Sequence, residues 1–97
     1  MDSTKYPTPH PQVAARVVDG SALIVLADSG EVNVLNPVGT RMWELMDGTR
    51  TVQEIADAIC AEYDVTAQQS LADVEELVSQ LMGANALVLQ DQPAQRG

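Results

Sequence analysis

The sequence is poor in the residues from which covalent cross-links and metal sites are built. Its 97 residues include one cysteine, Cys60, and one histidine, His10. A single cysteine cannot form an internal disulfide, and these two residues show no metal-ligand spacing, so no metal or cofactor is expected. No apolar run approaches the roughly 18 residues of a membrane span, and residues 1–12 lack the apolar core of a signal peptide. These absences predict a cytoplasmic protein that binds no membrane.

Basic residues are also scarce. Five Lys and Arg face fourteen Asp and Glu, which gives a net charge of -9. Nucleic-acid binding is therefore not expected, because neutralising phosphates supplies most of its non-specific affinity. Docking on anionic lipid is disfavoured for the same reason. The acidic balance favours partners that carry basic segments.

The two ends of the chain differ in composition from its middle. Three prolines, Pro7, Pro9 and Pro11, predict that residues 1–12 form an extended, disordered arm. An alternative is that this arm is a docking strand for a partner. Residues 91–97 are predicted to be a disordered tail. One folded domain is expected between them, over residues 13–90.

The first part of that domain has the pattern of short antiparallel strands. Residues 13–18 and 22–26 are apolar runs separated by Asp19-Gly20, which is a type I′ hairpin signal. A second turn around Gly30 leads to residues 31–35, where polar and apolar residues alternate. A three-stranded meander follows, and it needs a helical layer over its apolar face.

Three helices are predicted after the strands. Asn36-Pro37 is a helix start, and the first helix is expected over residues 37–47. Thr51 and Glu54 form a capping box for a second helix over residues 52–63. A third helix is expected over residues 67–83, followed by a short extended or packed segment at 86–89. The fold class is thus α+β, with a three-stranded antiparallel sheet followed by a three-helix bundle.

No catalytic constellation stands out. Asp73 and Glu76 lie close together on the third helix, but a solvated face explains them without any acid–base role. Cys60 lies on the apolar stripe of the second helix, where a buried structural thiol is expected rather than a nucleophile. Trp43 is expected in the core or at its edge, with a partner anchor as the alternative. The open edge of the third strand is the remaining candidate, because its unpaired backbone groups can accept a peptide as an added strand.

The order of short motifs resembles that of the PqqD-like family. The resemblance runs through GEVNVLNPVGTRMWELMDGTRTVQEIADAICAEYDV and ADVEELVSQLMGANALV, and it covers about residues 13–89. The matching pieces are Leu35-Asn36-Pro37, Trp43-Glu44-Leu45, Asp47-Gly48-Thr49-Arg50-Thr51, Glu54-Ile55, Asp73-Val74, Leu77 and Leu81.

This resemblance implies a winged-helix-like unit that recognises the leader segment of a ribosomally made precursor peptide. The leader would lie antiparallel along the third strand and against the third helix, and a separate modifying enzyme, a radical-SAM protein, peptidase or cyclase, would act on it. Around the third strand the sequence differs from the member that serves pyrroloquinoline quinone synthesis, so the pathway stays open between that cofactor, a lasso peptide and another product. The implied peptide-binding residues are Glu31, Val32, Asn33, Val34, Leu35, Asp73, Glu76, Leu77 and Gln80.

Other functions remain as alternatives at this point. A winged-helix outline also permits DNA binding, although the third helix has no Lys or Arg between residues 67 and 83. A general protein–protein adaptor, or a small redox enzyme that uses Cys60, are the others. Either a monomer or a dimer that exchanges strands through the open edge is compatible with the sequence.

Overall fold

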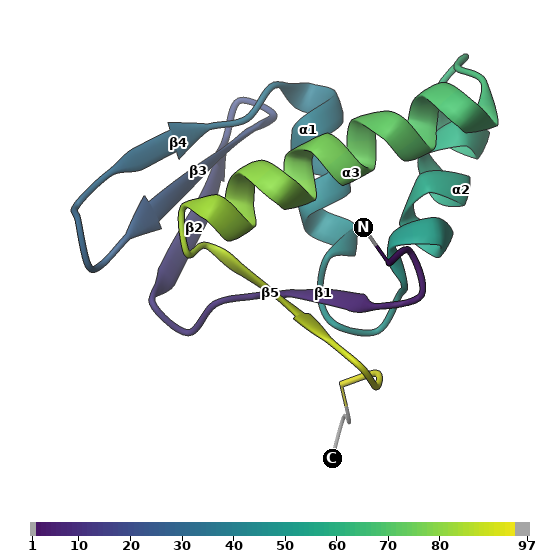
Figure 1. The fold of residues 1–97 in the computed structure, drawn as a ribbon. Helices are drawn as coiled ribbons and strands as arrows, with labels where there is room; N and C mark the ends of the chain where they lie inside the picture. Colours follow the sequence, from purple (N-terminus) through teal and green to yellow (C-terminus); the bar gives the residue numbers. More distant parts are fainter. Residues whose placement is uncertain (1, 95–97) are drawn as a thin grey trace.

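Three helices and two small antiparallel sheets make up the protein (Figure 1). The structure is a computed structural model, and it describes residues 2–94. The elements in chain order are β1 (Tyr6–Pro9), β2 (Val13–Val18), β3 (Ser21–Leu26), β4 (Val32–Val34), α1 (Pro37–Leu45), α2 (Val52–Glu62), α3 (Ala67–Gly83) and β5 (Leu87–Gln90). The predicted α+β class, with a three-stranded antiparallel sheet and three helices, is confirmed.

The larger sheet is the predicted meander, with strand order β2-β3-β4. Asp19 and Gly20 both have positive φ, 53° and 80°, as a type I′ hairpin turn requires. Val18 therefore pairs with Ser21, and the register continues to Val13 opposite Leu26. β3 pairs in turn with β4, which leaves β4 at one edge of this sheet and β2 at the other.

The helices begin at the predicted caps. The Asn36 side chain accepts a hydrogen bond from the Gly39 N–H at 2.7 Å, and Thr51 forms the full capping box with Glu54. The third helix has the predicted bounds, while the first ends at Leu45, two residues earlier than expected. Each helix thus starts where a side-chain oxygen satisfies an otherwise unpaired N–H.

The core lies between one face of the β2-β3-β4 sheet and the helices. Ala22, Ile24 and Leu26 alternate along β3 and are buried on this face, where α1 packs against the strand. Trp43 is buried as predicted. Cys60 is only half-buried, contrary to the expected burial, and its thiol donates to the Val65 carbonyl at 3.3 Å.

The second sheet corrects the prediction of a disordered N-terminal arm. Residues 6–9 form β1, which pairs antiparallel with β5. His10 N–H donates to the Ala86 carbonyl, so the even-numbered residues of β1 are the ones that face β5 with their backbone groups. Pro7 and Pro9 fall between them, and their missing N–H groups remove nothing from the ladder. The Pro7 carbonyl instead accepts from the Gly48 N–H at 2.9 Å, and Pro7 is buried.

The predicted disordered tail is likewise anchored over its first residues. Asp91 forms an ion pair with Lys5, and the Ala94 N–H donates to the Gly48 carbonyl at 2.8 Å. The remainder of that predicted tail, residues 95–97, lies outside the described residues. Within residues 2–94, no helix is long and apolar enough to cross a bilayer.

Candidate functional site

The free edge of β4 presents two residues whose backbone groups point away from the sheet. The Leu26 N–H donates to the Glu31 carbonyl, and the Leu35 N–H donates to the Ala22 carbonyl, both at 2.9 Å. Because backbone pairing alternates along an antiparallel ladder, Glu31, Asn33 and Leu35 face β3. The N–H and C=O groups of Val32 and Val34 therefore point outward. In the described part of the chain no further strand pairs with this edge.

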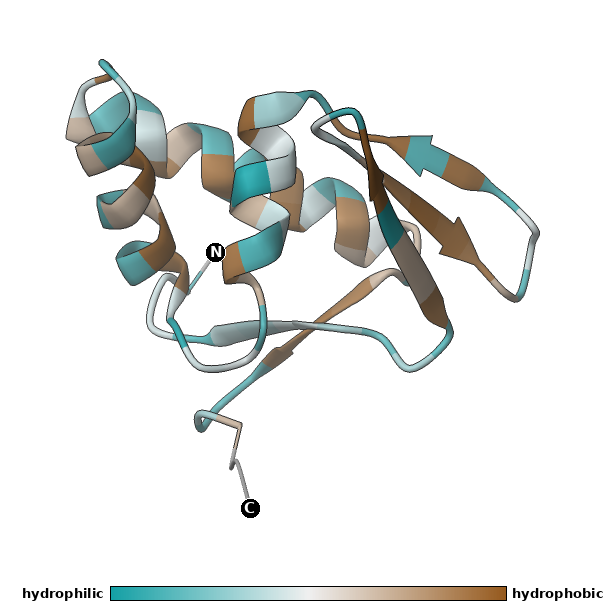
Figure 2. Ribbon diagram, turned by 180° about the vertical axis from the view of Figure 1, so that it is seen from behind, coloured by the Kyte–Doolittle hydropathy of each residue, from teal (hydrophilic) through white to brown (hydrophobic). Residues whose placement is uncertain are grey.

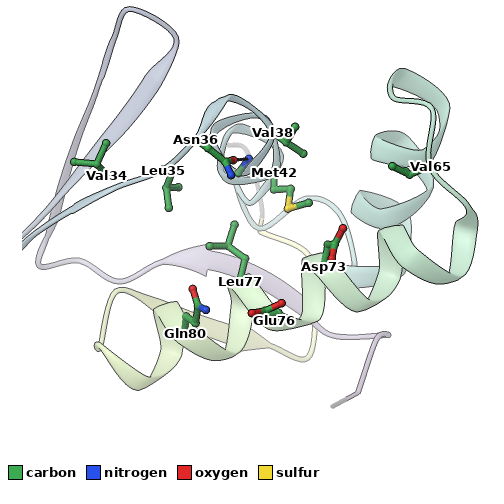
Figure 3. Close-up of a pocket in the computed structure, with 11 residues that line it drawn as sticks. Val34, Leu35, Asn36, Val38, Met42, Val65, Asp73, Glu76, Leu77 and Gln80 are labelled. Atoms are coloured by element: carbon green, nitrogen blue, oxygen red, sulfur yellow. Dashed lines mark hydrogen bonds between the residues drawn. The ribbon is translucent and has the colours of Figure 1, made fainter.

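A groove of about 530 Å³ runs beside this edge (Figure 3). One wall comes from the end of β4 and the start of α1, and the opposite wall comes from α3, with Val65 at the far end. The groove is lined by Val34, Leu35, Asn36, Val38, Gly39, Met42, Val65, Asp73, Glu76, Leu77 and Gln80.

A buried hydroxyl fixes the wall that joins β4 to α1. Thr40, which is 4% exposed, accepts from the Ala22 N–H at 2.8 Å and donates to the Leu35 carbonyl at 3.4 Å. The same Ala22 carbonyl accepts from the Leu35 N–H. One side chain of α1 thus ties the end of β4 to the central strand, and the edge holds a fixed position relative to α1 and the groove.

The floor of the groove is apolar and its α3 rim is acidic. Leu77 and Met42 are 9% and 4% exposed, and both side chains point into the space between α1 and α3 in Figure 3. Asp73 accepts from the Gln69 side chain at 2.8 Å, whereas Glu76 is exposed. Neither carboxylate forms an ion pair within residues 2–94. The groove can therefore hold an apolar side chain on its floor and a basic one at its rim.

The sequence-predicted site residues divide into two groups. Six line the groove, and the structure brings them together from two distant segments: Val34, Leu35, Asp73, Glu76, Leu77 and Gln80. Glu31, Val32 and Asn33 lie on or beside β4 but do not line the groove. Of these, Asn33 directs its backbone groups inward to Ile24.

Sequence reasoning missed the contribution of α1 and of the loop before α3. Val38 and Met42 belong to the apolar stripe of the first helix, and this stripe was assigned wholly to the core. In the structure Val38 is 36% exposed at the groove, as is Val65. A stripe that continues to the first turn of a helix directly after an edge strand is the signal that pointed to this wall.

An open strand edge beside an apolar groove defines a small α+β domain built to accept an extended chain. The sequence comparisons agree with this class. Residues 22–87 match the family described as coenzyme PQQ synthesis protein D (PqqD), and the chain belongs to this family. No curated protein matches the sequence.

Two solved structures are similar over most of this chain. TbiB1 in complex with the TbiA(beta) leader peptide is 28% identical, with a TM-score of 0.77 over 82% of this chain and 93% of that one. Lasso peptide synthetase B1 complexed with the leader peptide is 21% identical, with a TM-score of 0.76 over 86% of this chain and 98% of that one. The second likeness is one of fold.

Proposed function

We propose that this protein binds the leader segment of a ribosomally made precursor peptide and presents it to a separate modifying enzyme. The observation that carries the proposal is the groove between the open edge of β4 and the acidic rim of α3. Both similar structures are complexes with a leader peptide, and the chain shares their fold. Family membership is consistent with this role.

The leader adds as a strand antiparallel to β4 and exchanges backbone hydrogen bonds with Val32 and Val34. Every second leader side chain then points toward α3. An apolar side chain reaches Leu77 on the groove floor, and a basic side chain reaches Asp73 and Glu76 at the rim. Backbone bonds supply affinity that tolerates many sequences, while floor and rim select among them.

The protein itself performs no chemistry in this proposal, and catalysis belongs to the enzyme that takes the leader. A radical-SAM protein, a peptidase or a cyclase each fits this role, and the cytoplasm is where the encounter takes place. DNA binding has no support from the groove, because α3 contributes carboxylates there and carries no Lys or Arg.

Fluorescence polarisation with labelled leader peptides tests the proposal. The probes are synthetic peptides that match the N-terminal segments of short peptides encoded beside this gene, with a scrambled version of each as the control. We expect one leader to bind with a Kd below about 10 µM, equivalent to roughly 7 kcal/mol. Binding that is no tighter than that of the scrambled peptide, up to roughly 100 µM, would count against the proposal.

A further inference from the structure

The face of the β2-β3-β4 sheet that points away from the helices carries an exposed apolar surface. Alternation along the strands places Val18 of β2, Leu23 and Val25 of β3, and Val32 and Val34 of β4 on this face. Their exposed fractions reach 47% at Val18, 55% at Val32 and 65% at Val34, whereas Leu23 is half-buried. We call these five residues the outer face, and Figure 2 shows the hydrophobic stretches of the strands that form it.

The outer face forms one continuous surface. Val25 lies opposite Val32, and Leu23 lies opposite Val34. Both are non-hydrogen-bonded pairs, in which the side chains of neighbouring strands come closest. Three strands thus contribute to one apolar patch, and such patches on a small protein commonly mark an interaction site.

Charge indicates what kind of partner this surface fits. The turns at the two ends of the sheet carry the exposed acids Asp19, Asp28 and Glu31, and Arg16 is the cation on the same face. A second copy of this chain would bring the same acids and a net charge of -9 to the contact. A partner with an apolar centre and Lys or Arg at its rim is complementary instead.

The outer face also adjoins the leader site. Val32 and Val34 direct their backbone groups toward the proposed leader and their side chains toward the outer face. A leader added beside β4 continues the sheet, so its alternate side chains extend the same apolar surface. A protein that docks there contacts this chain and the bound leader together.

We infer that the outer face is the docking surface for the modifying enzyme, which would meet it with an apolar patch ringed by basic residues. This inference rests on the proposed function, and it adds a second binding surface separate from the leader groove. The enzyme and the leader then occupy opposite faces of one strand.

Two lysine substitutions on neighbouring residues of β2 test the inference. Val18→Lys places a charge on the outer face, whereas Val17→Lys places the same charge on the opposite face of the same strand, where Val17 is 54% exposed. The probe is the purified modifying enzyme encoded beside this gene, and its affinity for the full chain is measured by biolayer interferometry. Leader affinity is measured separately by fluorescence polarisation.

We expect Val18→Lys to weaken enzyme binding at least about tenfold, because a lysine buried without a partner opposes a basic rim. Val17→Lys should stay within about threefold of the unchanged protein, and both variants should bind the leader normally. Absent enzyme binding by the unchanged protein, equal loss in both variants, or no loss in Val18→Lys would overturn the inference. So would a dimer in sedimentation that Val18→Lys dissociates while enzyme affinity stays unchanged.

Two further measurements keep the outcomes distinguishable. If the circular dichroism spectrum shows that Val18→Lys does not fold, Val25→Lys on the central strand replaces it with the same expected loss. Failure of the unchanged protein to bind any leader, with enzyme binding still sensitive to the outer face, would refute the proposed function and leave the docking surface standing.

Discussion

The substitution Val34→Pro isolates the hydrogen bond on which strand addition depends. Val34 lies in an edge strand with its N–H directed outward, so a proline there removes no bond within the sheet. It does remove one donor to the leader and leaves a leader carbonyl without its partner. The loss of such a bond weakens binding by about 1–3 kcal/mol. The leader Kd should therefore rise roughly 5- to 150-fold.

The other edge of the same sheet provides the matched control. Val17 on β2 also directs its N–H outward, because the Ala27 N–H bonds the Gln12 carbonyl and fixes the alternation of that ladder. Fluorescence polarisation with the labelled leader should give an unchanged Kd for Val17→Pro. Equal affinity of Val34→Pro and the unchanged protein, with both folded by circular dichroism, would refute strand addition at β4. Weaker binding by Val17→Pro alone would move the leader to β2.

Three other perturbations test the rim, the N-terminal strand and a surface ion pair. Glu76→Lys at the groove should weaken a basic leader several-fold and flatten the salt dependence of its Kd, whereas Glu75→Lys, off the groove, should change little. Deletion of residues 1–11 removes β1 and should lower the free energy of unfolding by about 2 kcal/mol or more, visible in calorimetry as a melting temperature lower by roughly 8–16 °C. The Arg41 guanidinium hydrogen-bonds Glu62 and holds the pKa of that carboxyl below its usual value of 4.5, so its small stabilising effect is present above pH 4.5 and is lost as the pH falls through the lowered pKa. Glu62→Gln should lack this part of the acid sensitivity in urea titrations at pH 7 and pH 3; an identical acid response would contradict the assignment.

The features that local chemistry decides could be predicted from the sequence. The helix caps at Asn36 and Thr51 act within three residues, and the hairpin at Asp19-Gly20 needs only two residues with positive φ. The long apolar period over residues 67–83 gave the third helix with its bounds. The meander order then follows because short connections join neighbouring strands.

The features that depend on distant pairing could not be predicted in this way. Prolines read as an extended arm, since nothing near them in sequence shows that the segment spanning residues 87–90 lies alongside. The groove wall formed by Val38 and Val65 was missed for a related reason. An apolar stripe looks the same whether a neighbouring element covers all of it or leaves its first turn open.

The pairing of β1 with β5 has a consequence for how the chain is made. Tyr6 and Gln90 are partners, so the strand that leaves the ribosome first has to wait for the last one before it can pair. Translation at about 5–20 residues per second separates their appearance by several seconds or more. During that interval the meander and helices can already assemble, and closure of the two ends completes the domain only after synthesis has reached its final strand.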